Sequence, residues 1–346
     1  MTLAAVSRPA GAPALLEVAD LRVEVPVGGI LRPAVDGVSF TLEPGESLAV
    51  VGESGCGKTL LGRSLVDLLP EGARLGGSIR LRGEDLAGLT ERGWGRVRGR
   101  QIGLVFQEPA AALDPVRTIG WQIEEALSSS GRSGSSAVLR RRARELLAEV
   151  SFPDPDRALA EYPHRLSGGQ RQRAFLAIAL AGDPAILVAD EPTASLDSTV
   201  AADVLDLIDR LRRDRGLALI FITHDLASAA RRAGRALVLY AGRVVETGPA
   251  AAVFSDPQHP YTRALLASLP RLSDAITRGA RLSAIPGTVP DLAFRPRGCC
   301  AFAPRCPARF EPCDAAEPAF QPAGGGLARC FLFGGAPPPV SRPELP

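Results

Sequence analysis

A glycine-rich loop between an apolar run and a helical segment constrains this chain more than any other feature. Residues 48–51 form a short apolar strand pattern, and the loop after it reads Gly52-Glu53-Ser54-Gly55-Cys56-Gly57-Lys58-Thr59. Backbone N–H groups of such a loop can converge on phosphate oxygens, and the helix start adds favourable partial charge. We therefore expect the loop to bind a nucleotide, with Lys58 at the β- and γ-phosphates and Thr59 on Mg²⁺. An ordinary glycine turn is the alternative.

Two adjacent carboxylates end a second buried-strand pattern. Residues 185–189 are all apolar and lead directly into Asp190 and Glu191. Ligands of open parallel sheets bind where the strands end. We therefore expect Asp190 to contact Mg²⁺ and Glu191 to act as general base on the attacking water. Taken alone, such a pair is more often a helix cap or a surface charge, but here it accompanies a phosphate loop.

A second pattern typical of anion binding precedes the apolar segment 175–181. It reads Leu166-Ser167-Gly168-Gly169-Gln170, in which Ser167 suits a helix N-cap and the glycines allow backbone amides to face outward. A capped helix with a flexible entry is the plain alternative. Two phosphate-binding patterns with one lysine indicate that the second serves a nucleotide held by another subunit.

The hydrophobic pattern of the rest of the chain predicts an α/β protein. Apolar runs at 102–106 and 217–222 are short and uninterrupted, as in strands that are covered on both faces, and residues 109–165 are patterned as helices with a break at 128–136. No run approaches the roughly 20 apolar residues of a membrane-spanning helix. A formal net charge of +2 does not favour nucleic acid as a partner. The arginine-rich segment 138–150 is interpreted as a solvated helix face, with pairs such as Arg141 and Glu145, rather than as a nucleic-acid site.

In this order the motifs resemble those of ATP-binding cassette (ABC) proteins. By that resemblance, Gln107 is the Q-loop glutamine that touches Mg²⁺ and the attacking water, and His224 is the switch histidine at the γ-phosphate. Ser195-Leu196-Asp197 is similar to the D-loop, which crosses the dimer interface. The resemblance implies a P-loop NTPase of the ABC fold, with a parallel-sheet core, an antiparallel β subdomain and an α-helical subdomain at about 109–165. Val25 departs from the family, which usually has an adenine-stacking aromatic there.

The resemblance also implies a mechanism that needs two chains. They would close head to tail, with each ATP between Lys58, Thr59, Gln107, Asp190, Glu191 and His224 of one chain and Ser167, Gly168, Gly169 and Gln170 of the other. Positioning and charge then promote phosphoryl transfer. Two alternatives stay open: a non-transport ABC ATPase acting on nucleic acid or ribosomes, and a P-loop kinase or GTPase, which would have no use for the second set of residues.

The C-terminal part resembles the extension of oligopeptide and dipeptide importer ATPases. The similar stretches begin at His259-Pro260-Tyr261-Thr262, at Ile285-Pro286-Gly287 and at Phe302-Ala303-Pro304-Arg305-Cys306. We expect an ABC nucleotide-binding domain at 15–268 and a small extension at 269–346. The resemblance implies a peripheral subunit on the cytoplasmic face of the cell membrane, which drives import of peptides, nickel complexes or other small solutes. Its partners would be two membrane permease subunits, a sister ATPase or a second copy, and indirectly an extracytoplasmic solute-binding protein.

Five of the six cysteines lie in this extension. Cys300, Cys306, Cys313 and Cys330 are separated by five, six and sixteen residues, which is unlike the close pairs of structural zinc sites. Several members of the resembled subfamily hold a 4Fe–4S cluster on such a set, and four thiolates suit that cluster. Zinc and free thiols remain open, and Cys299 is interpreted as a bystander.

Overall fold

The computed structural model describes residues 13–107, 112–269 and 284–334. Its main sheet has the strand order β11-β12-β10-β9-β3-β8-β7-β6. Neighbouring strands run parallel among β3 (Ser47–Val51), β6 (Ile102–Val105), β7 (Ile186–Asp190), β8 (Ala218–Thr223) and β9 (Arg235–Tyr240). Every residue of β3, β7 and β8 is buried, which explains why these strands read as uninterrupted apolar runs. The predicted strands agree with β3, β6, β7 and β8 to within one residue at each end.

A second, antiparallel sheet packs against the first. It has the order β2-β1-β4-β5 and consists of β1 (Leu16–Val27), β2 (Ile30–Leu42), β4 (Arg74–Leu81) and β5 (Glu84–Asp85). Leu48 and Val50 of β3 face the core shared with this sheet and with α1 (Lys58–Ser64). Ala49 and Val51 face the opposite core, because successive side chains of a strand alternate.

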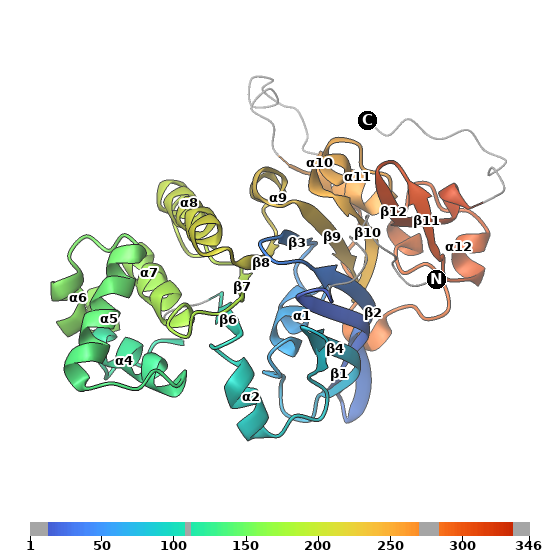
Figure 1. The fold of residues 1–346 in the computed structure, drawn as a ribbon. Helices are drawn as coiled ribbons and strands as arrows, with labels where there is room; N and C mark the ends of the chain where they lie inside the picture. The colour runs from blue at the N-terminus through green and yellow to red at the C-terminus, as the bar shows by residue number, and fades with distance from the viewer. Residues whose placement is uncertain (1–12, 108–111, 270–283, 335–346) are drawn as a thin grey trace, which may run out of the picture.

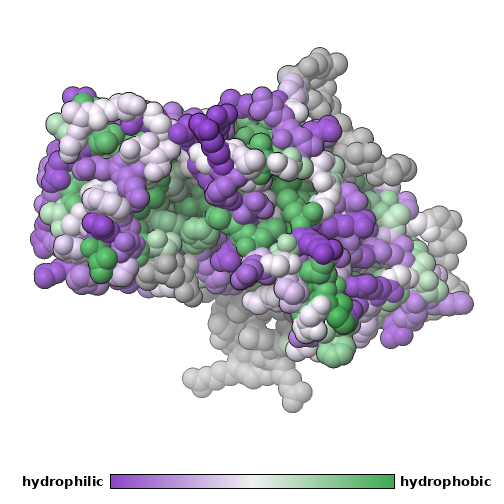
Figure 2. Space-filling view, turned by 90° about the horizontal axis from the view of Figure 1, so that it is seen from below, coloured by the Kyte–Doolittle hydropathy of each residue, from purple (hydrophilic) through white to green (hydrophobic). Residues whose placement is uncertain are grey.

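A group of helices forms a separate lobe beside the sheets (Figure 1). It contains α4 (Ile119–Ser129), α5 (Ser136–Glu149), α6 (Pro155–Ala160), the short 3₁₀ turn Pro163–Arg165 and α7 (Gly168–Ala179), and α8 (Ser198–Arg215) lies above α7 in this view. Helix α2 (Glu91–Val97) lies closer to the second sheet. Figure 2 shows hydrophobic residues gathered in a recess between the helical lobe and the sheets. None of the helices in the described ranges has the length and hydrophobicity of a membrane span.

The arginines of α5 pair with acidic side chains of the same lobe. Arg141 Nε lies 4.0 Å from Glu145 Oε1, and Arg144 Nε lies 2.8 Å from Asp156 Oδ1 of α6. These pairs confirm the predicted pairing of Arg141 with Glu145 and support interpreting this segment as a solvated helix face.

The C-terminal part extends the main sheet. Strand β10 (Arg243–Pro249) pairs antiparallel with β9 on one side and with β12 (Gly326–Arg329) on the other, and β11 (Phe320–Ala323) follows β12. Around these strands lie α9 (Leu226–Arg232), α10 (Ala250–Ser255), α11 (Pro260–Ala267), α12 (Pro312–Ala315) and the 3₁₀ turns Leu292–Phe294, Ala303–Arg305 and Phe331–Phe333. The residues after 269 thus share a sheet with those before it; the domain boundary there stays a prediction.

Candidate active site

The candidate site lies where four parallel strands end. β3, β8, β7 and β6 are neighbours in the sheet and point the same way, so their carboxyl ends meet at one edge. The phosphate loop follows β3, His224 follows β8, Asp190 ends β7 and Gln107 comes two residues after β6. Segments that are far apart in the sequence are therefore brought together as predicted.

The phosphate loop has backbone conformations that require glycine. Gly52, Gly55 and Gly57 have φ values of +153°, +76° and +109°, and a Cβ on Gly52 would lie 2.2 Å from the Leu239 carbonyl oxygen. The Lys58 ammonium is almost completely buried and donates to the carbonyl oxygens of Gly52 at 2.9 Å and Glu53 at 3.0 Å. The loop thus folds over its own lysine.

The side-chain oxygens of Thr59 and Asp190 lie next to each other beside the phosphate loop. The Thr59 hydroxyl donates to Asp190 Oδ1 at 3.3 Å, and Asp190 is 2% exposed. Burial raises the pKa of Asp190 above its usual range; the hydrogen bond from Thr59 opposes this and the nearby Glu191 adds to it. A divalent cation would offset the cost of a buried carboxylate, and hydroxyl and carboxylate oxygens are ligands that Mg²⁺ prefers.

Glu191 lies at the centre of the remaining polar groups. Its Oε2 accepts a hydrogen bond from Gln107 Nε2 at 3.2 Å and lies 3.2 Å from His224 Nδ1. The backbone of Glu191 has a φ of +46°, which is a strained conformation for a residue with a side chain. Its N–H donates to the Ile222 carbonyl of β8, which fixes this turn. This backbone conformation places the Glu191 carboxylate between Gln107, which follows β6, and His224, which follows β8.

The second anion-binding pattern lies elsewhere in this single chain. Ser167 and Gln170 form a reciprocal capping box at the start of α7, and Gly169 is buried against Val200 of α8. Figure 1 shows α7 in the helical lobe, apart from α1 and the phosphate loop. Leu196 packs against the helical core, and Asp197 caps α8. The structure therefore places Ser167, Gly168, Gly169 and Gln170 at the start of α7, apart from the phosphate loop of the same chain.

The four predicted cluster cysteines gather in the C-terminal part. Cys313 and Cys330 are buried, Cys300 and Cys306 both pack against one hydrophobic core, and the Cys300 N–H donates to the Cys313 carbonyl. Burial, reinforced by the neighbouring thiols, raises the pKa of Cys306 to about 12 and that of Cys330 to about 11. Even so, the described residues contain no group of three or more His, Cys, Asp or Glu arranged to hold a metal ion.

The sequence did not reveal a set of contacts behind the phosphate loop. Glu53, Gly55 and three residues from the C-terminal part, Tyr261, Arg295 and Arg305, are joined by hydrogen bonds. The only available signal was that Tyr261 and Arg305 lie in stretches that resemble importer ATPases. Nothing marked Arg295.

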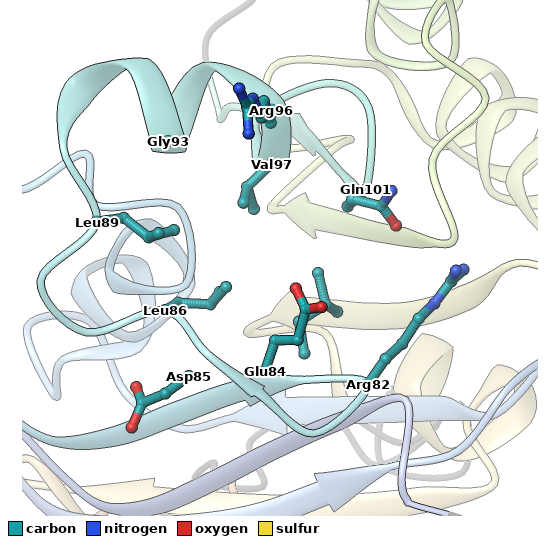
Figure 3. A pocket seen from close by; sticks show the side chains of 10 residues that line it. Arg82, Glu84, Asp85, Leu86, Leu89, Gly93, Arg96, Val97 and Gln101 are labelled. Atoms are coloured by element: carbon teal, nitrogen blue, oxygen red, sulfur yellow. The ribbon is translucent and has the colours of Figure 1, made fainter.

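A cavity of about 390 Å³ lies away from this site, between β4, β5 and α2. Figure 3 shows Leu86 and Leu89 on the left of it and Arg82 and Gln101 on the right, with Val97 above and Glu84 below. None of the predicted site residues lines it, so its size does not make it the reaction site.

Comparisons with known proteins cover both the strand-end region and the C-terminal part. A family model described as "ABC transporter" matches residues 35–194, and one described as "Oligopeptide/dipeptide transporter, C-terminal region" matches residues 245–313. A peptide import ATP-binding protein of Brucella abortus (strain 2308) is 48% identical over 318 residues, which cover 91% of this chain and 94% of that protein. The chain belongs to the ABC transporter family. It is an ABC ATPase with the predicted fold class.

Other similar proteins point the same way. The oligopeptide transport ATP-binding protein OppD of Mycobacterium tuberculosis (strain H37Rv) is 48% identical over 304 residues, which cover 88% of this ABC ATPase and 49% of that longer protein. A dimeric structure of MJ0796, described as a bacterial ABC transporter cassette, has a TM-score of 0.61 at 27% identity and covers 68% of this chain and 98% of its own. A post-hydrolysis state of that cassette with ADP and phosphate is equally similar, at 26% identity.

Proposed function

We propose that this ABC ATPase drives the import of oligopeptides or dipeptides. The observation that carries the proposal is the C-terminal part, which matches a model named for oligopeptide and dipeptide transporters at residues 245–313. A relative named for peptide import matches over nearly its whole length, which supports the same conclusion. The alternative of a non-transport ABC ATPase on nucleic acid or ribosomes has no comparable support.

The proposed assembly places the chain at the cytoplasmic face of the membrane. It would bind two integral permease subunits and a second ATPase, either a sister chain or another copy, and receive solute indirectly from an extracytoplasmic binding protein. Within the ATPase dimer, Lys58 and the loop backbone would hold the phosphates, and Thr59, Asp190 and Gln107 would hold Mg²⁺. Ser167, Gly168, Gly169 and Gln170 of the opposite chain would complete the site, with residues 195–197 at the interface.

In this arrangement Glu191 would activate the attacking water. Its carboxylate is held by Gln107 and lies beside His224, so the three side chains can sense the γ-phosphate and the water together. Mg²⁺ would supply charge stabilisation of the phosphoryl group when bound.

Reconstitution tests the proposed import. The chain would be co-purified with its two permease subunits and placed in vesicles with the binding protein outside and ATP inside. We expect short peptides to stimulate ATP hydrolysis and to accumulate within the vesicles. A nickel complex added in the same way is the control. Stimulation by the nickel complex but not by peptides would contradict the proposal.

We also propose that Cys300, Cys306, Cys313 and Cys330 close around a 4Fe–4S cluster when it is inserted, since the described residues form no ready-made metal site. All four lie in the C-terminal part, where burial and neighbouring thiols raise the pKa of Cys306 and Cys330, and thiolates are the usual ligands of such clusters. When bound, the cluster would link the four cysteine-bearing segments of the C-terminal part to one another through iron–sulfur bonds.

We expect protein purified without oxygen to contain iron and acid-labile sulfide in equal amounts, and Cys306→Ser to lose both. Cys299→Ser is the matched control and should keep them, because Cys299 is not one of the four. Zinc without sulfide, or no metal, would contradict the cluster.

A further inference from the structure

Glu53 of the phosphate loop uses all of its polar groups in contacts that fix its position. Its N–H donates to the Tyr261 hydroxyl at 2.8 Å, and its carbonyl oxygen accepts from the Lys58 ammonium at 3.0 Å. Its carboxylate accepts from both terminal nitrogens of Arg305, at 2.7 and 2.9 Å. The residue that holds the loop lysine is therefore itself held by two side chains that lie more than 200 residues further along the chain.

Arg305 is built into the protein rather than lying on its surface. Its side chain is 6% exposed, its Nε donates to the Pro286 carbonyl at 2.7 Å, and its guanidinium lies 5.7 Å from the centre of the Tyr240 ring. The hydrogen bonds to Glu53 raise the pKa of Arg305. A bidentate pair with so little exposure has a fixed geometry, and removal of one partner leaves a poorly solvated charge.

Tyr261 is equally fixed. Its ring is fully buried against Tyr240 and Phe302, with centroid distances of 4.7 and 5.4 Å. Its N–H donates to Nδ1 of the buried His259 at 3.0 Å. Burial lowers the pKa of His259 to about 3, so the imidazole stays neutral and able to accept. The hydroxyl of Tyr261 therefore meets the Glu53 N–H with little freedom to move.

Arg295 adds a third contact from the same part of the chain. It donates to the Gly55 carbonyl at 2.9 Å and to the Ala34 carbonyl of β2 at 2.9 Å. The outer side of the phosphate loop thus carries hydrogen bonds from the C-terminal part at both Glu53 and Gly55. Such carbonyls point outward when the loop amides converge on phosphate.

We propose that Arg305 and Tyr261 are positioning residues for nucleotide binding. They act through Glu53: by fixing its backbone, they hold the loop in the shape that presents its amides and the Lys58 ammonium to the phosphates. The C-terminal part of the chain is then a component of the ATP site, whatever solute the transporter carries.

The test measures MgADP affinity and steady-state ATP hydrolysis of the full-length chain. Arg305→Lys keeps the charge but loses the bidentate pair, and we expect it to weaken MgADP binding and raise KM for ATP roughly tenfold, since a hydrogen bond to a charged group contributes about one factor of ten or more. Tyr261→Phe keeps the ring and removes one hydroxyl, so a smaller loss of roughly fivefold is expected. In both variants kcat at saturating ATP should change less than about twofold. Once nucleotide is bound, the loop makes the same contacts with the phosphates as in the unmodified protein, so the loss is one of binding.

Two comparisons separate positioning from general stability. Arg309→Lys alters an exposed pair with Asp314 in the same region and should leave affinity unchanged. The double variant Arg305→Lys with Tyr261→Phe should weaken binding by less than the product of the single effects, because both act through Glu53.

A lower melting temperature with unchanged MgADP affinity in both single variants would overturn the proposal. Unchanged affinity with unchanged stability would overturn it as well. If Arg305→Lys does not fold, the milder Tyr261→Phe decides the matter alone, and normal affinity in that variant counts against the proposal.

Discussion

Replacing Glu191 with glutamine is expected to lower the ATP hydrolysis rate by at least about 100-fold while leaving ATP binding intact. A positioned general base contributes about two to four orders of magnitude to a rate. Glutamine has nearly the same shape and can keep the contact with Gln107, but it cannot take a proton from water. The phosphate loop, which is proposed to hold the nucleotide, is unaltered. The measurements are the rate of phosphate release and the affinity for MgATP.

The same variant should accumulate as an ATP-bound dimer. ATP would lie between two chains and persist there, so size-exclusion chromatography with MgATP is expected to show a shift that is absent with MgADP. Glu145→Gln, on the exposed face of α5, is the matched control and should hydrolyse ATP normally. Near-normal turnover of Glu191→Gln would show that another group activates the water.

Gly52→Ala is expected to destabilise the chain strongly and to abolish nucleotide binding. The new methyl group would lie 2.2 Å from the Leu239 carbonyl oxygen and 2.9 Å from the Cys56 sulfur, at a backbone φ of +153°. A backbone atom of β9 cannot move aside as a flexible side chain can. Strained φ and overpacking each cost about 1–3 kcal/mol. We therefore expect the free energy of unfolding, measured by urea denaturation, to fall by about 3 kcal/mol or more.

Gly45→Ala separates the clash from the backbone strain. Gly45 precedes β3 and has a φ of +70°, but an added methyl group there would meet no atom within 4 Å. The free energy of unfolding of this variant should fall by about 1 kcal/mol, and nucleotide binding should be retained. Equal losses in both variants would contradict the role assigned to the clash.

The sequence predicted the strand-end part of the site because its information is local. Each predicted element there combines an apolar run with the polar residue that follows it, as for Asp190 after β7 and His224 after β8. Parallel neighbours then bring these polar residues to one edge without further information. The resemblance to ABC proteins identified Gln107 and His224 as site residues. Only the structure shows that both lie 3.2 Å from the Glu191 carboxylate.

The contacts behind the phosphate loop could not be predicted in the same way. Arg305 lies 252 residues from Glu53, and neither residue has a periodicity that indicates its partner. Charge gave no guide, since the chain has forty basic and thirty-eight acidic residues. The pairing depends on how the C-terminal part packs around Tyr240 and Phe302, which is a matter of tertiary shape.

The pairing of β12 with β10 has a consequence for any shortened form of this protein. Where Glu246 and Thr247 face Ala328 and Leu327, backbone groups of β10 are hydrogen-bonded to β12. Cutting the chain after residue 269 would leave those backbone groups without partners at an exposed edge of the sheet. Strands of other molecules can pair with such an edge. We therefore expect a truncated cassette to self-associate through β10, so its oligomers would be a misleading guide to the proposed dimer.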